Sequence, residues 1–318
     1  MTSRGFSLVE LLIALLLGLL LLGFTVQIFA SLMVSSRQSQ QLAQLQQNGQ
    51  LALNLLHNEL QNTGFWGGVA PDQISMAGAD SAMPAPDCRE DDLDSGSFPV
   101  SGQPFVSLYA KVAAPGRQLN CLTSLAPDSE VLQLKRAVGL AVSAAELRPN
   151  RFYIAPHWQQ SRFIDQDSAG LEADRVFYPY QHLVFYVQQQ RVDGQYIPVL
   201  MRKRLVRSVS GSARIATDSV IDGVERLHFE FGIDANQDGR LNYMLPTGMM
   251  NNEHWQQQHG RIVSIRFYIL LRSTLADPHY LNQQSYQMGA SRFEAPDDHY
   301  RRLLLAGSVY FTNNAVQQ

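Results

Sequence analysis

The sequence predicts an α+β protein in which one long N-terminal helix packs, by its second half, on an antiparallel β-rich domain. An apolar run opens the chain, a Gln-rich stretch with helical spacing follows, and the first proline is Pro71. Beyond that point, short runs of β-branched and aromatic residues alternate with turn residues. Neither a fixed repeat nor a linker divides this second part, so we expect a single globular domain over residues 64–318.

The first predicted element is a helix from about Phe6 to about Asn62, roughly 85 Å long at 1.5 Å per residue. Its first half, residues 6–34, contains the apolar stretch Leu8 to Val34, which is longer than the about 20 residues needed to cross a bilayer. Its second half, residues 35–63, is amphipathic, and we expect it to pack on the globular domain. The apolar stripe of this half consists of Leu42, Leu45, Ala52, Leu56 and Leu60.

Residues 67–102 are rich in Pro, Gly, Ser, Ala and Asp with little periodicity, which predicts a long surface excursion. Short strand-like runs follow it. In the run 224–233, apolar residues alternate with polar His228 and Glu230, as in a half-buried strand. The predicted strands are 105–112, 130–137, 151–155, 182–188, 199–206, 224–233, 262–271 and 303–311.

The charge balance argues against nucleic-acid binding. Charged residues make up 17% of the chain and the formal net charge is −3, so no global basic field is present. One local basic cluster combines Arg202-Lys203-Arg204 with Arg207. On an alternating strand these side chains would divide between two faces, which favours a solvated edge strand over a DNA-binding patch.

The N-terminal motif Gly5-Phe6-Ser7-Leu8-Val9-Glu10, with Arg4 before it and the apolar run after it, resembles a prepilin-type leader. A secretory signal is removed at a small-residue site of the A-x-A kind, and no such site follows the run. The resemblance implies that a prepilin peptidase cuts after Gly5 and methylates the new amino terminus at Phe6. Residues 1–5 would be the leader, and the apolar helix would stay in the mature protein.

Glu10 is a carboxylate at the edge of a membrane-length apolar helix, where a charge is costly and usually has a functional partner. From the residue type alone, a side chain that snorkels to the headgroup layer is an equal alternative. The resemblance to pilins implies that Glu10 pairs with the methylated amine of Phe6 on a neighbouring subunit. Such a pair would satisfy two charges inside an apolar filament core.

Two segments near the C-terminus resemble the PilW family of type IV minor pilins. One is Ile221-Asp222-Gly223-Val224-Glu225-Arg226-Leu227, which leads into Phe231-Gly232-Ile233-Asp234, and the other surrounds Arg301-Arg302 before the last predicted strand. With the N-terminal motif, the resemblance covers residues 1–65 and parts of the C-terminal region.

The resemblance implies a minor pilin that helps to initiate a type IV pilus or lies at its tip, with effects on adhesion or motility. Its partners would be the prepilin peptidase, other minor and major pilins, and the inner-membrane assembly platform. Before assembly the chain would cross the inner membrane once with a periplasmic domain, and afterwards it would lie on the pilus. Two alternatives stay open: a minor pseudopilin of a type II secretion system, and a pilus-tip adhesin or DNA-uptake module.

The chain has two cysteines, Cys88 and Cys121. An even cysteine count in an exported chain favours one disulfide, with two free thiols as the alternative. Neither cysteine lies in a C-x-x-C pair, so redox catalysis and zinc binding lack support.

Residues 234–242 carry oxygen-bearing side chains at alternate positions and a glycine at the sixth, which is the pattern of a calcium loop. The twelfth position is Leu245, where an EF-hand has a bidentate glutamate, and the loop follows a predicted strand. A solvated turn is the alternative, because Asn, Asp and Gly are turn residues. The candidate ligands for Ca²⁺, the one cofactor that the sequence indicates, are Asp234, Asn236, Asp238, Arg240 (through its carbonyl) and Asn242.

Catalytic motifs do not support an enzyme. The sequence lacks a G-x-S-x-G elbow, an H-E-x-x-H pair, a P-loop and a G-x-G-x-x-G fingerprint. His254 and His259 are five residues apart, which is the wrong spacing for two metal ligands on one helical face.

Overall fold

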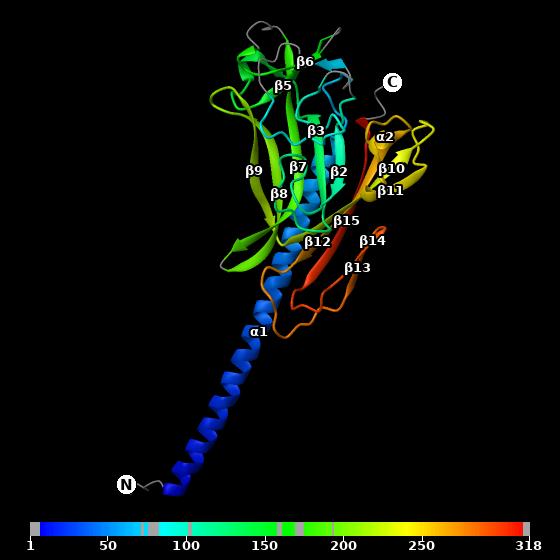
Figure 1. Cartoon of the computed structure of the whole chain (residues 1–318). Coiled ribbons are helices and arrows are strands. Elements are labelled where there is room, and N and C mark those ends of the chain that lie inside the picture. The colour runs from blue at the N-terminus through cyan, green and yellow to red at the C-terminus, as the bar shows by residue number, and fades with distance from the viewer. Residues whose placement is uncertain are drawn as a thin grey trace.

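The computed structural model describes residues 7–70, 73–75, 83–100, 104–157, 161–168, 175–192 and 194–313. A single helix, α1 (Leu8–Gln61), runs out of a β-rich head and projects far beyond it (Figure 1). The predicted α+β class is confirmed, with the second half of α1 on the head and the first half outside it.

Helix α1 begins and ends at residues that suit those positions. Ser7 is the N-cap, and it forms a capping box with Glu10. Gly64, with a φ of +84°, lies in the left-handed region just beyond the last turn. Leu42 departs from the predicted apolar stripe, because its side chain is 43% exposed. The buried side of the helix consists of Leu45, Gly49, Ala52, Leu56 and Leu60.

Most of the head belongs to one nine-stranded sheet. Strand pairs are antiparallel except β1 with β6, and the 17-residue strand β7 is the spine on which β3, β4, β5 and β8 pair. The strands are β1 (Ile74–Ser75), β2 (Leu108–Val112), β3 (Glu130–Ala137), β4 (Val142–Ser143), β5 (Phe152–Ala155), β6 (Ser161–Ile164), β7 (Val176–Val192), β8 (Gln195–Arg207) and β9 (Ala213–Asp222).

A four-stranded antiparallel sheet, in the order β11-β10-β12-β15, forms the second layer. A separate hairpin, β13 with β14, is inserted before the last strand. These strands are β10 (Val224–Asp234), β11 (Tyr243–Pro246), β12 (Arg261–Arg272), β13 (Ser285–Met288), β14 (Ser291–Glu294) and β15 (Arg302–Tyr310). Among the described residues of the head, short helices include η2 (Ala144–Glu146), η4 (Thr247–Met249) and α2 (Asn252–Trp255).

The main core lies between the two sheets and α1, which packs on β15, β12 and β9. Gly49 allows the closest approach, since a Cβ there would lie 2.7 Å from a methyl group of Leu305 on β15. Arg136 of β3 forms an ion pair with Glu59, and the Asn48 amide donates to the Asp222 carbonyl at 3.0 Å. The second half of α1 is therefore held by packing and by polar contacts.

Strand β10 is buried on both faces, so the predicted half-buried strand is wrong. His228 and Glu230 are each 6% exposed. The Glu130 carboxylate extends from β3 of the large sheet to β10. It lies 2.7 Å from His228 Nδ1 and accepts a hydrogen bond from the Phe229 amide at 2.7 Å. Thr247 donates to the same carboxylate at 2.6 Å. His228 therefore contacts Glu130 of the large sheet, and Glu230 accepts from the Ala290 amide of the β13–β14 hairpin. Buried polar side chains need such hydrogen-bond partners.

The prediction of a surface excursion over 67–102 is wrong for residues 93–98, of which Leu93, Asp94, Ser95, Ser97 and Phe98 are buried. Three buried polar side chains of the large sheet form hydrogen bonds with polar groups of this segment. Lys135 donates to the Ser95 and Gly96 carbonyls at 2.7 and 3.1 Å, Gln133 donates to the Ser95 carbonyl, and His182 Nδ1 lies 2.9 Å from Ser97 Oγ. A loop can be buried where its backbone finds such partners.

The expectation that the basic cluster lies on a solvated edge strand is wrong. It belongs to β8, which pairs with β7 on one side and β9 on the other. Arg202 and Arg204 both bind Asp218 of β9, at 3.2 and 2.8 Å. Arg207 is buried and binds Asp165 at 2.9 Å. These charges are partnered within the fold.

Candidate functional site

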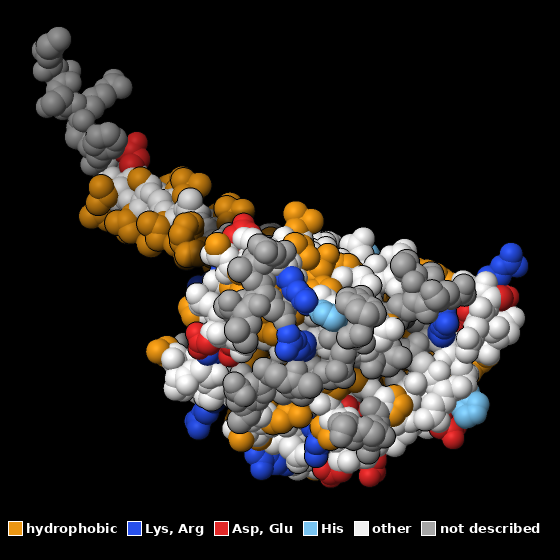
Figure 2. All heavy atoms as spheres, turned by 90° about the horizontal axis from the view of Figure 1, so that it is seen from above, with side chains coloured by type: hydrophobic (Ala, Val, Ile, Leu, Met, Phe, Trp, Pro, Cys, Tyr) orange, Lys and Arg blue, Asp and Glu red, His pale blue; other side chains and the backbone are white. Residues whose placement is uncertain are grey.

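The most distinctive surface of the molecule is the first half of α1. Each residue from Ser7 to Arg37 is exposed, and apolar side chains cover the projecting helix (Figure 2). By length and composition α1 can cross a membrane, and none of the apolar window is buried in the head. At 1.5 Å per residue the stretch Leu8 to Val34 is about 40 Å long. Such an apolar surface requires lipid or other apolar helices around it.

Glu10 lies at the start of this surface and is exposed. Its carboxylate accepts from the Ser7 amide at 2.9 Å, and its own amide donates to the Ser7 hydroxyl at 3.2 Å. This reciprocal pair closes the first turn of the helix. Gly5 and Phe6, the predicted processing residues, lie outside the described residues, so cleavage and methylation stay predictions.

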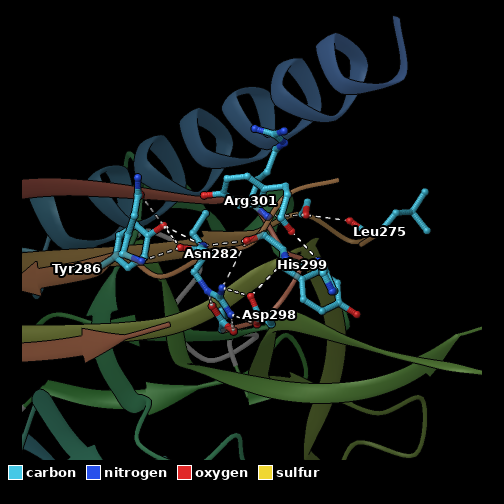
Figure 3. Close-up of polar contacts among 12 residues, drawn as sticks. Leu275, Asn282, Tyr286, Asp298, His299 and Arg301 are labelled. Carbon is cyan, nitrogen blue, oxygen red and sulfur yellow. Dashed lines mark hydrogen bonds and ion pairs between the residues drawn. The ribbon is translucent and has the colours of Figure 1, made fainter. Parts of the chain in front are cut away.

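Where α1 enters the head, a buried arginine joins the two C-terminal segments that resemble the PilW family. Arg302 of β15 binds both oxygens of Glu225 on β10, at 2.6 and 2.9 Å. It also binds both oxygens of Asp298, a residue labelled in Figure 3, at 2.7 Å. The side chain of Arg302 is 1% exposed. Burial raises the pKa of Asp298, but the hydrogen bond and charge of Arg302 outweigh it and lower that pKa. Two bidentate pairs on one guanidinium make a strong, directional link.

The adjacent Arg301 extends the link toward α1. It donates to Asp277 at 2.8 Å and its guanidinium lies 4.3 Å from the ring centre of Tyr280. The hydrogen bond from Arg301 lowers the pKa of Asp277. Gln38 of α1 donates to the same carboxylate at 3.4 Å. We name the contacts of Arg301 and Arg302 with Asp277, Asp298 and Glu225 the arginine clasp.

The clasp positions the segment 273–284, which connects β12 to β13 and lies beside α1 (Figure 1). The Ser273 hydroxyl donates to the Leu275 carbonyl at 2.9 Å, and His299 Nδ1 lies 2.6 Å from the Tyr280 carbonyl. A cavity of about 580 Å³ separates this segment from α1. The sequence carries no local signal for the position of this segment, because that position depends on clasp contacts between residues distant in the chain.

Cys88 and Cys121 form a disulfide, as predicted. It joins the buried loop that contains Cys88 to the turn before β3, and both cysteines belong to the main core. Gln133 donates to the Cys88 carbonyl at 2.7 Å, which ties the same point to the large sheet. The disulfide therefore reinforces a loop that has little regular structure of its own.

The candidate calcium loop follows β10. The Asp234 carboxylate is buried and accepts from the amides of Asp238 and Gly239, at 3.2 and 2.8 Å. The Asn242 side chain accepts from the Ala235 amide at 2.6 Å. These bonds also form a self-contained turn. Calcium binding stays a prediction, with Asp234, Asn236, Asp238, Arg240 and Asn242 as its ligands.

The two histidines His254 and His259 of the head lie near an acidic side chain. His254 lies on α2 and His259 beyond it, where it is 3.4 Å from Glu253. Among the residues that the structure describes, no group of three or more His, Cys, Asp or Glu side chains could hold a metal ion.

Comparisons with known proteins identify two parts of the chain. Residues 184–313 match the family model described as type IV pilus-assembly protein W, or PilW. Residues 1–26 match the model of the prokaryotic N-terminal methylation motif. Searches of curated proteins and of solved structures gave no match. The first match contains the arginine clasp and the second contains the start of α1.

Proposed function

We propose that this PilW-family type IV pilin is a minor subunit that acts in the initiation or tip complex of a type IV pilus. The family and its role in pilus assembly follow from the two matches, which agree with the resemblance in the sequence. The observation that carries the proposal is the exposed apolar half of α1, which ends where the head begins. In the inner membrane this half would span the bilayer, and in a pilus it would lie among the helices of other pilins.

The proposed route begins with the prepilin peptidase, which would cut after Gly5 and methylate Phe6. The subunit would then wait in the inner membrane with its head in the periplasm. Glu10 would attract the free amine of a neighbouring subunit during insertion, since two opposite charges in an apolar core are stable only as a pair. The partners would be other minor and major pilins and the inner-membrane assembly platform. The role is structural, and we assign no catalytic step to the chain.

The capping box makes the test of Glu10 sharper. Glu10→Gln keeps an acceptor for the Ser7 amide but removes the charge, whereas Glu10→Ala removes both. If Glu10 acts through its charge, both variants should reach the membrane and fail to restore piliation in a deletion strain. If it acts only as a helix cap, Glu10→Gln should restore piliation.

The control is Glu294→Gln on β14, an exposed glutamate far from α1 in sequence, which should behave as wild type. Piliation is counted by electron microscopy, and the protein level in membranes is measured by immunoblot. Normal piliation with Glu10→Gln would refute the proposed charge pairing. A deletion strain with normal pili and defective secretion would refute the pilus role and indicate a pseudopilin of a type II secretion system.

A further inference from the structure

We propose that the end of the head nearest the apolar half of α1 rests on the bilayer surface before assembly, as a second lipid contact beside the helix. We name this end the basal rim: residues 191–192 and 194–196 at the β7–β8 turn, and residues 273–284 between β12 and β13. Both parts lie toward the projecting half of α1 (Figure 1). The inference rests on the membrane anchoring proposed above.

The position of the rim along α1 sets its depth. About 20 helical residues cross the hydrocarbon core, which places residue 28 near its outer face if the crossing starts at Leu8. Six further residues add about 9 Å, slightly more than the roughly 5–7.5 Å of one headgroup layer, and reach Val34. Val34 and Arg37 line the same cavity as Leu275 and Gln195 of the rim. The rim therefore lies at the outer edge of the lipid headgroup layer.

The side chains of the rim have the chemistry of an interfacial contact. Tyr196 is 62% exposed, Leu275 is 55% exposed and Leu281 is 52% exposed. Tyrosine is favoured at the membrane–water interface, and exposed leucines gain free energy by partial insertion. Both leucines lie in the one short segment 273–284 of the rim.

The charges of the rim fit a phosphate layer. Arg37 and His279 line the cavity, and Arg191 lies at the β7–β8 turn. Among the described rim residues the one acidic side chain is Asp277, and Arg301 binds it at 2.8 Å; Asp193 of the β7–β8 turn lies outside the described residues. Basic groups near a membrane surface attract anionic lipid headgroups. An unpaired carboxylate at this depth would oppose such contact, and Arg301 supplies the countercharge for Asp277.

The clasp also determines how the apolar groups are presented. The segment is held through Asp277, Tyr280 and Asn282, and the Asn282 amide donates to the Tyr300 carbonyl at 2.8 Å. Figure 3 shows Leu275 at the end of this network, with its side chain directed away from it. The leucine is thus exposed on a segment whose backbone is fixed, which lowers the entropy lost on contact with a surface.

Fluorescence quenching in vesicles tests the inference. The full-length protein is reconstituted into vesicles of phosphatidylcholine and phosphatidylglycerol, with an environment-sensitive dye on one introduced cysteine. The native cysteines do not react with the dye, because they form a disulfide. Leu275→Cys reports on the rim. The matched control, Val209→Cys, is an exposed apolar position in the turn at the opposite end of β8.

A dye at position 275 should emit at shorter wavelength and be quenched by lipids that carry a spin label near the headgroup, whereas a dye at 209 should not. A third variant, Leu21→Cys on α1, reports on the anchor through a quencher deep in the hydrocarbon. Quenching at 21 with equal, low quenching at 275 and 209 would overturn the basal rim and leave the anchor intact. Loss of quenching at 21 would refute the anchor itself and the rim with it.

A charge variant separates lipid attraction from simple proximity. Arg37→Gln together with Arg191→Gln should reduce the quenching at 275 in vesicles with phosphatidylglycerol. The same pair of substitutions should have a smaller effect in vesicles of phosphatidylcholine alone. Equal quenching in all four combinations would contradict the proposed role of the basic side chains. As a control for folding, quenching at position 21 should stay unchanged in both vesicle types.

Discussion

Replacement of Arg302 by methionine is the most informative perturbation of the head, because one side chain holds two carboxylates there. The guanidinium is 1% exposed, while Glu225 and Asp298 are 13% and 21% exposed. Removing one partner of a buried ion pair costs about 3–5 kcal/mol, since the other charge is left unpaired. Arg302→Met keeps most of the side-chain volume, so we expect a loss of that size in the free energy of unfolding.

The assay is urea unfolding of the full-length protein in detergent, followed by the fluorescence of buried Trp66 and Trp255. The matched control is Arg292→Met, because Arg292 is 59% exposed and pairs with a 74% exposed Glu294. Exposed pairs contribute about 0–1 kcal/mol, so the control should change the free energy of unfolding little.

Neutralising the two carboxylates that Arg302→Met leaves unpaired shows whether the loss of stability is electrostatic or comes from poorer packing. Glu225→Gln and Asp298→Asn, added to Arg302→Met, should recover part of the lost stability, because amides tolerate burial without a countercharge better than carboxylates do. A loss of stability with Arg302→Met no larger than that with Arg292→Met would contradict the buried ion pairs as its cause. A further loss when both carboxylates are neutralised would contradict it as well.

Three further predictions concern the rest of the head. Replacing Cys88 and Cys121 together by serine should lower the free energy of unfolding by about 3–4 kcal/mol in the chain-entropy model, measured by urea unfolding, and a loss below about 1 kcal/mol would contradict it. Burial lowers the pKa of Lys135 from 10.5 to about 7, so the unfolded chain binds more protons between these values. The free energy of unfolding should therefore rise with pH above 7 in the wild type and rise less in Lys135→Met, and equal slopes would reject this explanation. Calorimetric titration of the wild type with Ca²⁺ should show binding, with Kd of about 10⁻⁴–10⁻³ M, that Asp234→Asn abolishes, and a wild type without binding heat would exclude the calcium site.

The sequence was sufficient for the elements whose pattern is local. The helix could be predicted because its apolar run and Gln-rich stretch keep one period, and the structure gives Leu8–Gln61. All eight predicted strands are present, although β7 is longer than expected at both ends. The disulfide could be predicted from two cysteines in a chain with an export motif.

The sequence was insufficient where a residue depends on a distant partner. Strand β9 was missed because its residues are mixed in polarity, with Asp218 bound to arginines of β8. The burial of Leu93–Phe98 depends on Lys135 and His182, whose partners lie far away in the chain.

The candidate site was predictable in part. The N-terminal motif is contiguous, so Glu10 could be singled out from the sequence. The clasp is not contiguous, because Glu225 and Arg302 lie on β10 and β15 and meet only through the sheet. Leu275 carries no signal in the sequence, since its importance comes from its position beside α1.

The proposed function requires that the chain is cut after Gly5 and keeps its apolar helix for assembly. The most direct measurement is the intact mass and N-terminal sequence of the protein isolated from membranes of its own host. We expect a chain that begins at methylated Phe6. A chain that still begins at Met1, or one cut beyond Ala30, would contradict it, because neither could enter a pilus by the proposed route.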